Sequence, residues 1–241
     1  MSTKRSDIIA QLQKSILPLQ GFKSHLKLAD AGLGIINRAF PGVSFPVGAI
    51  HEFITNGKED VAATTGFVAG MLGSLMRSGG AVIWIGGDQT VFPPALEYFG
   101  IAPDKVIFIN LYKEKEILWV MEEALKCEGL AAVVGEVSQL SFTASRRLQL
   151  AVEQSQVTGF ILRSNLHTNN TTASITRWKI THLPSVLEDR MPGVGFPRWN
   201  VDLLKVRNGV PSSWQVEFVA GAFRQIPGMM SIQTELHKKT G

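Results

Sequence analysis

The chain has 241 residues, 45% of them hydrophobic and 18% charged, which is enough for one full core with short terminal additions. No apolar run reaches the roughly 20 residues of a membrane span, and the first residues hold no apolar signal segment. We therefore expect a cytoplasmic protein that does not contact membranes. Cys127 is the only cysteine, which excludes internal disulfides and multi-cysteine metal sites, and its apolar helical surroundings predict a buried thiol.

The net charge of +4 is unevenly distributed along the chain. Residues 1–139 carry 12 Lys and Arg against 14 Asp and Glu, whereas residues 140–210 carry nine against four. The basic excess in the later part suits a polyanion or an acidic protein as partner. It suits equally well a solvated face of dispersed charges, so both interpretations stay open.

The amino-terminal residues 1–40 predict a helical segment. Ile8, Leu12 and Ile16 recur at helical spacing among polar neighbours. Prolines and glycines follow, and the apolar run 49–54 then predicts the first buried strand. We expect one core domain from residue 41 to residue 220 and a loosely held tail from 221 to 241.

Helices and strands are expected to alternate after this first strand. The predicted helices begin at Glu59, after Pro93, near Ile117 and at a Thr143 cap. The predicted strands cover residues 81–85, 105–110, 130–137 and 159–162. These strands are apolar on nearly every residue, which predicts an α/β domain with a mostly parallel sheet, helices on both faces and right-handed crossovers.

The pattern changes from about residue 173 onward. Strand-like segments at 174–181, 199–207 and 213–218 follow one another without helices between them. The pair Asn208-Gly209 is a turn signal that joins the last two as a hairpin. The parallel sheet is therefore expected to end in antiparallel strands.

A phosphate-binding loop belongs after the first strand of such a sheet, in the form G-x-x-x-x-G-K-[ST], but the sequence there is TNGKEDVAATTG. The aligned motif positions hold Thr55 and Asp60 for the glycines, Val61 for the lysine and Ala62 for the hydroxyl residue. Lys58 offers a displaced lysine, but Glu59 follows it where a hydroxyl belongs. An ordinary strand-to-helix turn with acidic residues at the helix N-terminus fits the same letters.

The second nucleotide-related position is the end of strand 130–137, where a nucleotidase carries an aspartate for magnesium and water. Gly135 stands at that place, and Glu136, one residue later, is expected on the opposite face of the strand. Asp88 is the other candidate for a water-activating acid, and capping of the following turn is its alternative role. The histidines are scattered without zinc-site spacing, so we expect neither a metal nor a cofactor.

Several segments together resemble the RecA core and are most similar to the ImuA family, over about residues 41–218. They are PVGAIHEF, GGAVIWIGGD, LEYFGIAPDKVIFI, ALKCEGLAAVVGEV, TASRRLQLAVEQSQVTGFILRS, TRWKI, PRWNVDLLKVRNG and SSWQVEF. The resemblance implies a RecA-like fold and a non-catalytic accessory role in damage-induced (SOS) mutagenesis and translesion DNA synthesis. The partner that it implies is an ImuB-type Y-family polymerase homologue, with a mutagenic replicative-type polymerase engaged indirectly and RecA as a further candidate.

A DNA or partner surface is the next expectation, with direct DNA binding left open. The segment SNLHTNNTTAS, residues 164–174, follows the strand ending near Leu162 and has no Lys or Arg, which argues against strong phosphate contact there. The candidate basic residues are Arg146, Arg147, Arg163, Arg177 and Lys179. Each has a structural alternative: a charged outer helix face for the first two, an ion pair with Glu136 for Arg163, and a solvated strand face for the last two. Trp178, Trp199 and Trp214 suit base stacking or, more simply, the core.

Two other functions compete with the accessory role. One is a degenerate nucleotidase that uses Lys58 with Glu136 or Asp88. The other is a regulator with a different target, as the related SulA group has in the division protein FtsZ.

Overall fold

The computed structural model describes residues 31–87, 91–164, 170–187 and 195–226. It contains one nine-stranded sheet in the order β3-β2-β4-β5-β1-β6-β7-β8-β9. The strands are β1 (Ile50–Ile54), β2 (Ala81–Gly86), β3 (Val106–Asn110), β4 (Leu130–Val137), β5 (Thr158–Arg163), β6 (Thr176–Leu183), β7 (Arg198–Val206), β8 (Ser212–Val219) and β9 (Ala222–Gln225). Pairing is parallel from β3 across to β6 and antiparallel from β6 to β9. The expected mostly parallel sheet with an antiparallel end is confirmed, and the fold is RecA-like.

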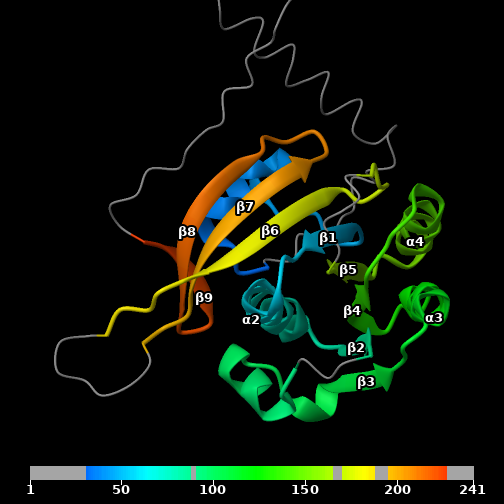
Figure 1. Ribbon diagram of the computed structural model, residues 1–241, viewed down its shortest axis with the longest axis horizontal. Helices are drawn as coiled ribbons and strands as arrows, with labels where there is room; N and C mark the ends of the chain where they lie inside the picture. The colour runs from blue at the N-terminus through cyan, green and yellow to red at the C-terminus, as the bar shows by residue number, and fades with distance from the viewer. Residues whose placement is uncertain (1–30, 88–90, 165–169, 188–194, 227–241) are drawn as a thin grey trace, which may run out of the picture.

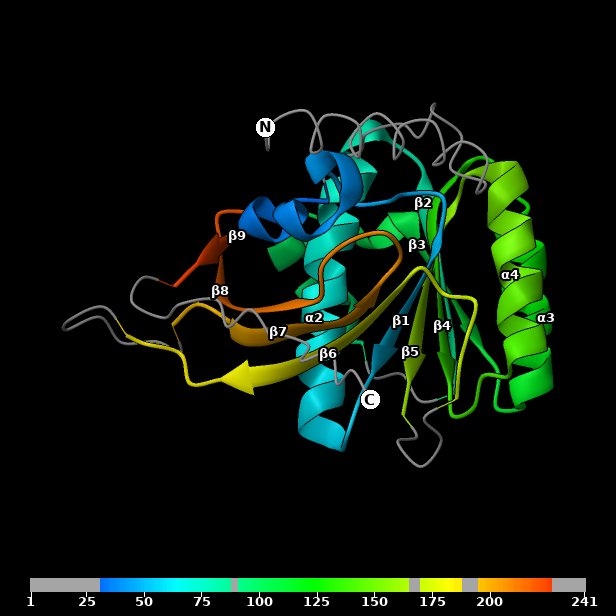
Figure 2. The same cartoon turned by 90° about the horizontal axis from the view of Figure 1, so that it is seen from above.

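Helices cover both faces of the sheet, as expected (Figures 1 and 2). The α-helices are α2 (Lys58–Leu75), α3 (Glu114–Leu125) and α4 (Phe142–Ser155). The 3-10 helices are η1 (Gly34–Ala39), η2 (Pro41–Val43), η3 (Met76–Ser78), η4 (Pro93–Phe99) and η5 (Pro103–Lys105). None of the helices within the described ranges combines the length and the apolar character that a membrane span needs.

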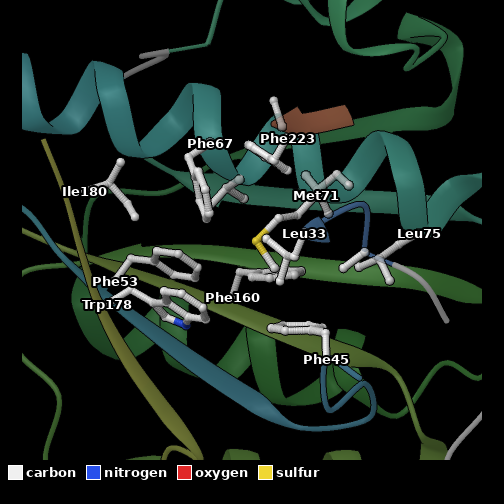
Figure 3. Close-up of a cluster of buried hydrophobic side chains, with 14 of the residues drawn as sticks. Leu33, Phe45, Phe53, Phe67, Met71, Leu75, Phe160, Trp178, Ile180 and Phe223 are labelled. Carbon is white, nitrogen blue, oxygen red and sulfur yellow. The ribbon is translucent and has the colours of Figure 1, made fainter. Parts of the chain in front are cut away.

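Two hydrophobic cores form because the strands are apolar on both faces. The larger lies between the sheet and α2 and is rich in aromatic rings (Figure 3). Phe53 and Trp178 stack there with ring centroids 5.9 Å apart, and Phe67 and Phe223 approach to 4.6 Å. The smaller core lies beneath α3 and α4 and includes Met121. The sheet is thus fixed from both sides, which holds the ends of its strands in place.

Residues before position 41 and after position 220, the expected limits of the core domain, also pack into this larger core. Leu33 and Ile36 are fully buried in the larger core, and the Phe223 N–H of β9 donates to the Gly32 carbonyl. β9 pairs with β8 beyond residue 220, where the tail was expected to begin. Burial of Phe223 against α2 explains why the sheet continues there. The helix expected around Leu12 lies outside the described residues.

Two local expectations were wrong. Ser141, and not Thr143, caps α4, because its hydroxyl accepts from the Ala144 N–H at 3.1 Å. Cys127 is exposed, because α3 ends at Leu125 and the thiol lies in the turn before β4. The hairpin at Asn208 is confirmed: its φ of 58° is the left-handed conformation that Asn tolerates in a turn.

Close packing of α2 on the η4 segment gives a first testable prediction. A Cβ at Gly73 would meet the backbone carbonyl oxygen of Phe99, which has little freedom to move. Gly73→Ala is expected to lower the free energy of unfolding by about 1–3 kcal/mol, despite the better helix propensity of alanine. Urea unfolding measures this change. Gly129→Ala is the control, because a Cβ there meets nothing within 4 Å, and equal losses in both variants would contradict the prediction.

Candidate functional site

A cavity of about 780 Å³ opens at the carboxyl ends of the parallel strands. This edge is where open α/β sheets bind ligands. Five neighbouring connections contribute to its walls, from β1, β2, β3, β4 and β5. The lining residues are Thr55, Gly57, Lys58, Val61, Ala62, Gly87, Leu111, Tyr112, Glu114, Ile117, Glu136, Val137, Ser138, Leu162 and Ser164. The cavity therefore contains both loops in which the sequence placed the degenerate nucleotide site, and we call it the carboxyl-edge cavity.

The β1–α2 junction is too short to wrap a phosphate. Only Thr55, Asn56 and Gly57 separate β1 from α2, because the helix already begins at Lys58. Gly57 has φ 91°, a conformation that glycine adopts without strain and that turns the chain sharply into the helix. The residues that would form the rest of a phosphate loop are helical instead.

One backbone N–H of this junction donates its hydrogen bond to a carboxylate of the protein itself. The Asn56 N–H donates to Oδ2 of Asp60 at 3.2 Å, and Asp60 holds the place of the motif's second glycine. The Thr55 N–H and hydroxyl both donate to the Arg163 carbonyl, at 2.9 and 3.2 Å. The first two backbone donors after β1 are thus satisfied within the protein.

The other residues of the degenerate loop divide into those that line the cavity and those in the first turn of α2. Val61 and Ala62 present apolar side chains to the cavity, and Lys58 reaches its rim. Glu59 is exposed and lies 3.9 Å from His182 of β6. The acidic side chains Glu59 and Asp60 stand in the first turn of α2, where the helix dipole favours negative charge.

Glu136 points into the cavity from β4. Its Oε1 accepts from the Trp84 Nε1–H at 2.7 Å. Gly86 of β2 leaves room for the carboxylate, since a Cβ there would lie 2.8 Å from Cδ of Glu136. Gly135 faces the other side of the sheet, toward Met121 of α3, so the predicted opposite orientation of residues 135 and 136 is confirmed. Asp88 lies outside the described residues.

Tyr112 and Glu114 are among the cavity residues that the sequence analysis did not single out. Tyr112 is 80% exposed and lies against Gly87, where a Cβ would be 2.8 Å from its ring. Glu114 accepts from the Gln139 N–H, which ties the start of α3 to the end of β4. The available signal was their position just after strand β3, at the same sheet edge as the other connections.

The charges in the cavity disfavour a polyanion. Glu114 and Glu136 are its carboxylates and Lys58 is its single cation among the described lining residues. Each carboxylate already accepts a hydrogen bond from the protein. The described residues hold no cluster of three His, Cys, Asp or Glu side chains with which to bind a metal ion. The site can hold an apolar or hydrogen-bonding group, whereas a triphosphate would meet an acidic wall.

Two of the predicted surface arginines are directed into the protein, which corrects that expectation. Arg163 is 1% exposed and its Nη1 donates to Oε1 of Glu52 at 2.9 Å. Arg177 donates from Nε to the other oxygen, Oε2, at 3.0 Å. The ion-pair partner expected for Arg163 was Glu136, and the structure supplies Glu52 of β1 instead. The sequence could not show this, because parallel pairing of β1 with both β5 and β6 creates the contact.

The same cluster holds the chain that enters β6. The Thr172 hydroxyl donates to Oε2 of Glu52 at 2.7 Å, and Lys205 donates to the Thr172 carbonyl at 2.9 Å. Arg177 also donates to the Asn170 carbonyl at 2.9 Å. Burial first, and then the charge of Arg177, lowers the pKa of Lys205. We call Glu52, Arg163, Arg177, Thr172 and Lys205 the Glu52 cluster.

The remaining basic candidates are dispersed. Arg146 and Arg147 are exposed on α4, and Arg147 pairs with Glu122 of α3 at 2.6 Å. Lys179 is half-buried on β6, in register with Asp202 of β7. The five residues therefore form no common open patch. The core interpretation of Trp178, Trp199 and Trp214 is confirmed, since they are only 0%, 4% and 7% exposed.

The chain is similar to proteins of known name over most of its length. Protein ImuA of Caulobacter vibrioides strain NA1000 is 35% identical over 206 residues, covering 80% of this chain and 84% of the relative. Protein ImuA of Caulobacter vibrioides strain CB 15 matches with the same identity and coverage. The chain belongs to the ImuA family. No protein-family model matches it. The shortened β1–α2 junction and the Glu52 cluster are thus features of an ImuA-family protein with a RecA-like sheet.

Proposed function

We propose that this ImuA-family protein is a non-catalytic accessory factor in damage-induced (SOS) mutagenesis. It assists translesion DNA synthesis through protein contacts with an ImuB-type Y-family polymerase homologue. The proposal rests on family membership for the process and on the carboxyl-edge cavity for the absence of catalysis. In this role the RecA-like sheet binds no nucleotide and is a rigid support for protein-binding surfaces.

The single observation that carries the non-catalytic assignment is the bond from the Asn56 N–H to Asp60. Phosphate binding at a helix N-terminus needs backbone donors that point at the ligand and a local excess of positive charge. Here α2 begins at Lys58, a carboxylate takes a loop donor, and Val61 and Ala62 stand where the lysine and hydroxyl belong. A nucleotide would have to displace Asp60 and then lie beside two further carboxylates.

Titration calorimetry with magnesium and ATP tests this assignment. We expect no saturable binding of ATP up to about 1 mM, the concentration at which even a binding free energy of about −4 kcal/mol would be seen. An active RecA protein in the same buffer serves as the positive control for the ligand. Tight, magnesium-dependent binding that Lys58→Ala removes would contradict the proposal.

The partner is tested by affinity purification of the full chain from DNA-damaged cells. Recovery of an ImuB-type polymerase homologue is the expected result. Recovery of FtsZ without that homologue would favour the SulA-like alternative. A replicative-type polymerase should appear only when the ImuB-type protein is present, because its contact is proposed to be indirect.

A second candidate function is a degenerate nucleotidase, and one observation favours it. Lys58 and Glu136 line the same cavity, so a cation and an acid meet there. This function requires turnover of ATP that stops in both Lys58→Ala and Glu136→Gln. Turnover that survives either change belongs to a contaminant, and absence of turnover supports the accessory role.

A further inference from the structure

One face of the antiparallel part of the sheet carries no helix of the described chain. α2 packs on the other face of these strands, where Trp178, Val201 and Val216 are buried. On the uncovered side, α3 and α4 pack on β1, β2, β4 and β5 instead, and Figure 2 shows them beside β6, β7 and β8. Side chains alternate between the two faces of a strand, so every second residue points away from α2. We call this surface, which runs from Arg207 next to β6 to Arg224 on β9, the open face.

Cations predominate on the open face. They are Arg177, Lys179, Arg198, Lys205, Arg207 and Arg224. The carboxylates on the same side are Glu52, Asp202 and Glu217. Cations therefore outnumber carboxylates two to one on this face, whereas the whole chain has 24 Lys and Arg against 20 Asp and Glu. The charge excess of the chain is concentrated here.

The positive charge is densest where β6 begins and β7 ends. Lys205 lies opposite Arg177 on the neighbouring strand, and Arg207 follows two residues later on the same side. The Lys205 ammonium donates to the Thr172 carbonyl at 2.9 Å. The Arg207 guanidinium donates to the next carbonyl, that of Ala173, at 3.4 Å. Two cations thus meet over one short segment, although like charges at neighbouring positions of a sheet repel.

The carboxylate of the Glu52 cluster is already bonded to other cations. Glu52 accepts from Arg163 at 2.9 Å and from Arg177 at 3.0 Å, so it neutralises charge at both of its oxygens. Within the described part of the chain, neither Lys205 nor Arg207 forms an ion pair, and the printed bonds of both go to backbone carbonyls. Their charge is available to an anion from outside the protein.

Lys179 extends this group of cations along β6. It lies opposite Asp202 of β7, but the Asp202 carboxylate accepts from the Asn200 amide at 3.0 Å, and Lys179 forms no ion pair with the described residues. Successive open-face positions on one strand are about 7 Å apart. That distance is close to two base-pair steps of DNA, each about 3.4 Å. The cations therefore form a row whose spacing suits a phosphate backbone.

The other side chains of the open face favour nucleic acid over protein. Of the large apolar side chains on β6 to β9, Leu204 at the bulge of β7 is the exposed one. Protein interfaces are anchored by aromatic and apolar groups, whereas DNA interfaces are polar and strongly positive. Thr181, Asn200, Ser213 and Gln215 lie among the cations, and hydroxyl and amide groups of this kind bind phosphate oxygens.

The same surface favours duplex over single-stranded DNA. Proteins that bind single strands stack unpaired bases on exposed aromatic rings. Trp178, Trp199 and Trp214 of these strands are buried in the core, on the face that packs against α2. The open face therefore offers phosphate contacts without a platform for bases.

We propose that the open face binds the phosphate backbone of duplex DNA, with Lys179, Lys205 and Arg207 as its phosphate contacts. The contact is independent of base sequence, because side chains that lie on a sheet face and bind phosphates do not read base edges. It places an accessory factor directly on the DNA, which is a further activity beyond the proposed protein contacts.

Fluorescence anisotropy of the full chain with a labelled duplex of about 20 base pairs tests the proposal. Three phosphate contacts predict an affinity loss of about 40-fold between about 50 and 200 mM salt. Lys179→Gln, Lys205→Gln and Arg207→Gln should each weaken binding about fivefold or more at the lower salt and reduce the salt slope by about one. No saturable binding at the lower salt would overturn the proposal.

Two control variants separate charge from folding. Lys115→Gln removes an exposed lysine of α3, on a different surface, and should change the affinity less than about twofold. Lys205→Arg keeps the charge and a donor for the Thr172 carbonyl, so it should bind DNA within about twofold of the unchanged chain. Equal losses in Lys115→Gln and Lys205→Gln, or loss of binding in Lys205→Arg, would contradict the assignment.

Competitors distinguish the class of ligand. Unlabelled duplex should displace the labelled duplex at lower concentration than a single strand of the same length or polyglutamate does. A single strand that competes better than the duplex would overturn the choice of duplex, and polyglutamate that competes better would assign the open face to an acidic protein. Capture of an ImuB-type homologue does not depend on this face, so a failure here leaves the proposed function standing.

Discussion

Glu52→Gln is expected to lower the free energy of unfolding by about 3–5 kcal/mol, because it leaves buried arginine charge without its anion. Glu52 is fully buried and bonds Arg163 at 2.9 Å and Arg177 at 3.0 Å. The glutamine would keep the volume and part of the hydrogen bonding, so the loss reports the charge. Urea unfolding monitored by tryptophan fluorescence measures it, since Trp178 lies in the neighbouring core.

The control for this prediction is an ion pair of similar length at the surface. Lys113 and Glu116 are 3.0 Å apart at the start of α3, with 79% and 49% of their side chains exposed. Glu116→Gln should cost about 1 kcal/mol or less, because water screens the pair. The double variant Glu52→Gln with Arg163→Met should lose less than the sum of the single losses, because removing both partners relieves the uncompensated charge. Additive losses would mean that Glu52 does not neutralise Arg163.

Stability is expected to fall steeply in mild acid because of His51. The ring is fully buried, and burial lowers its pKa from 6.5 to about 3, against a smaller raising effect of the Pro46 carbonyl. The hydrogen-bond chain explains how the neutral ring is held. Trp178 Nε1–H donates to the Thr176 hydroxyl at 2.7 Å, that hydroxyl donates to His51 Nδ1 at 2.7 Å, and Nε2–H donates to the Pro46 carbonyl at 2.9 Å. A second ring proton, on Nδ1, would face the Thr176 hydroxyl that donates to Nδ1 in the neutral state, so that hydrogen bond would be lost.

The sign of the pH effect follows from this lowered pKa. Between pH 6.5 and about 3 the unfolded chain binds a proton at His51 that the folded chain does not. The free energy of unfolding should therefore fall by about 1.4 kcal/mol for each pH unit below 6.5, and the contribution of His51 is complete above it. His51→Gln should be less stable at neutral pH and lose this slope. Parallel curves of stability against pH for the two proteins would show that the acid sensitivity lies elsewhere.

The phosphate-loop prediction depended on residues that are adjacent in the sequence, which is why the sequence could place this segment at the carboxyl edge of the sheet. The motif positions Val61 and Ala62 line the cavity in the first turns of α2, and Asp60 lies in the same helix start. The length of the junction was predicted to within one residue, because the expected strand 49–54 and the expected helix start at Glu59 agree with β1 ending at Ile54 and α2 beginning at Lys58. Tyr112 and Glu114 entered the site only through the sheet order, in which β3 follows β2 outward.

The basic candidates show the opposite outcome. Arg163 and Arg177 are polar residues in strand-like segments, and a period-two pattern cannot state which partner lies on the neighbouring strand. The register His51↔Thr176 and Glu52↔Arg177 was needed before Glu52 could be seen as their common anion. Arg146 and Arg147, on an amphipathic helix, were correctly expected to lie on its outer face, because helical periodicity alone decides that.

By itself, the sequence determined the alternation of helices and strands, the mostly parallel sheet with its antiparallel end, and the absence of the glycine, lysine and hydroxyl residues of the phosphate-loop motif. These follow from local chemistry and periodicity, which are properties of short segments. Only the tertiary structure decided that Asp60 accepts a hydrogen bond from the Asn56 N–H, that Glu52 neutralises two arginines, and that β3 lies at the edge of the sheet. Those depend on which strands become neighbours, and the burial of residues far apart in the chain determines that choice.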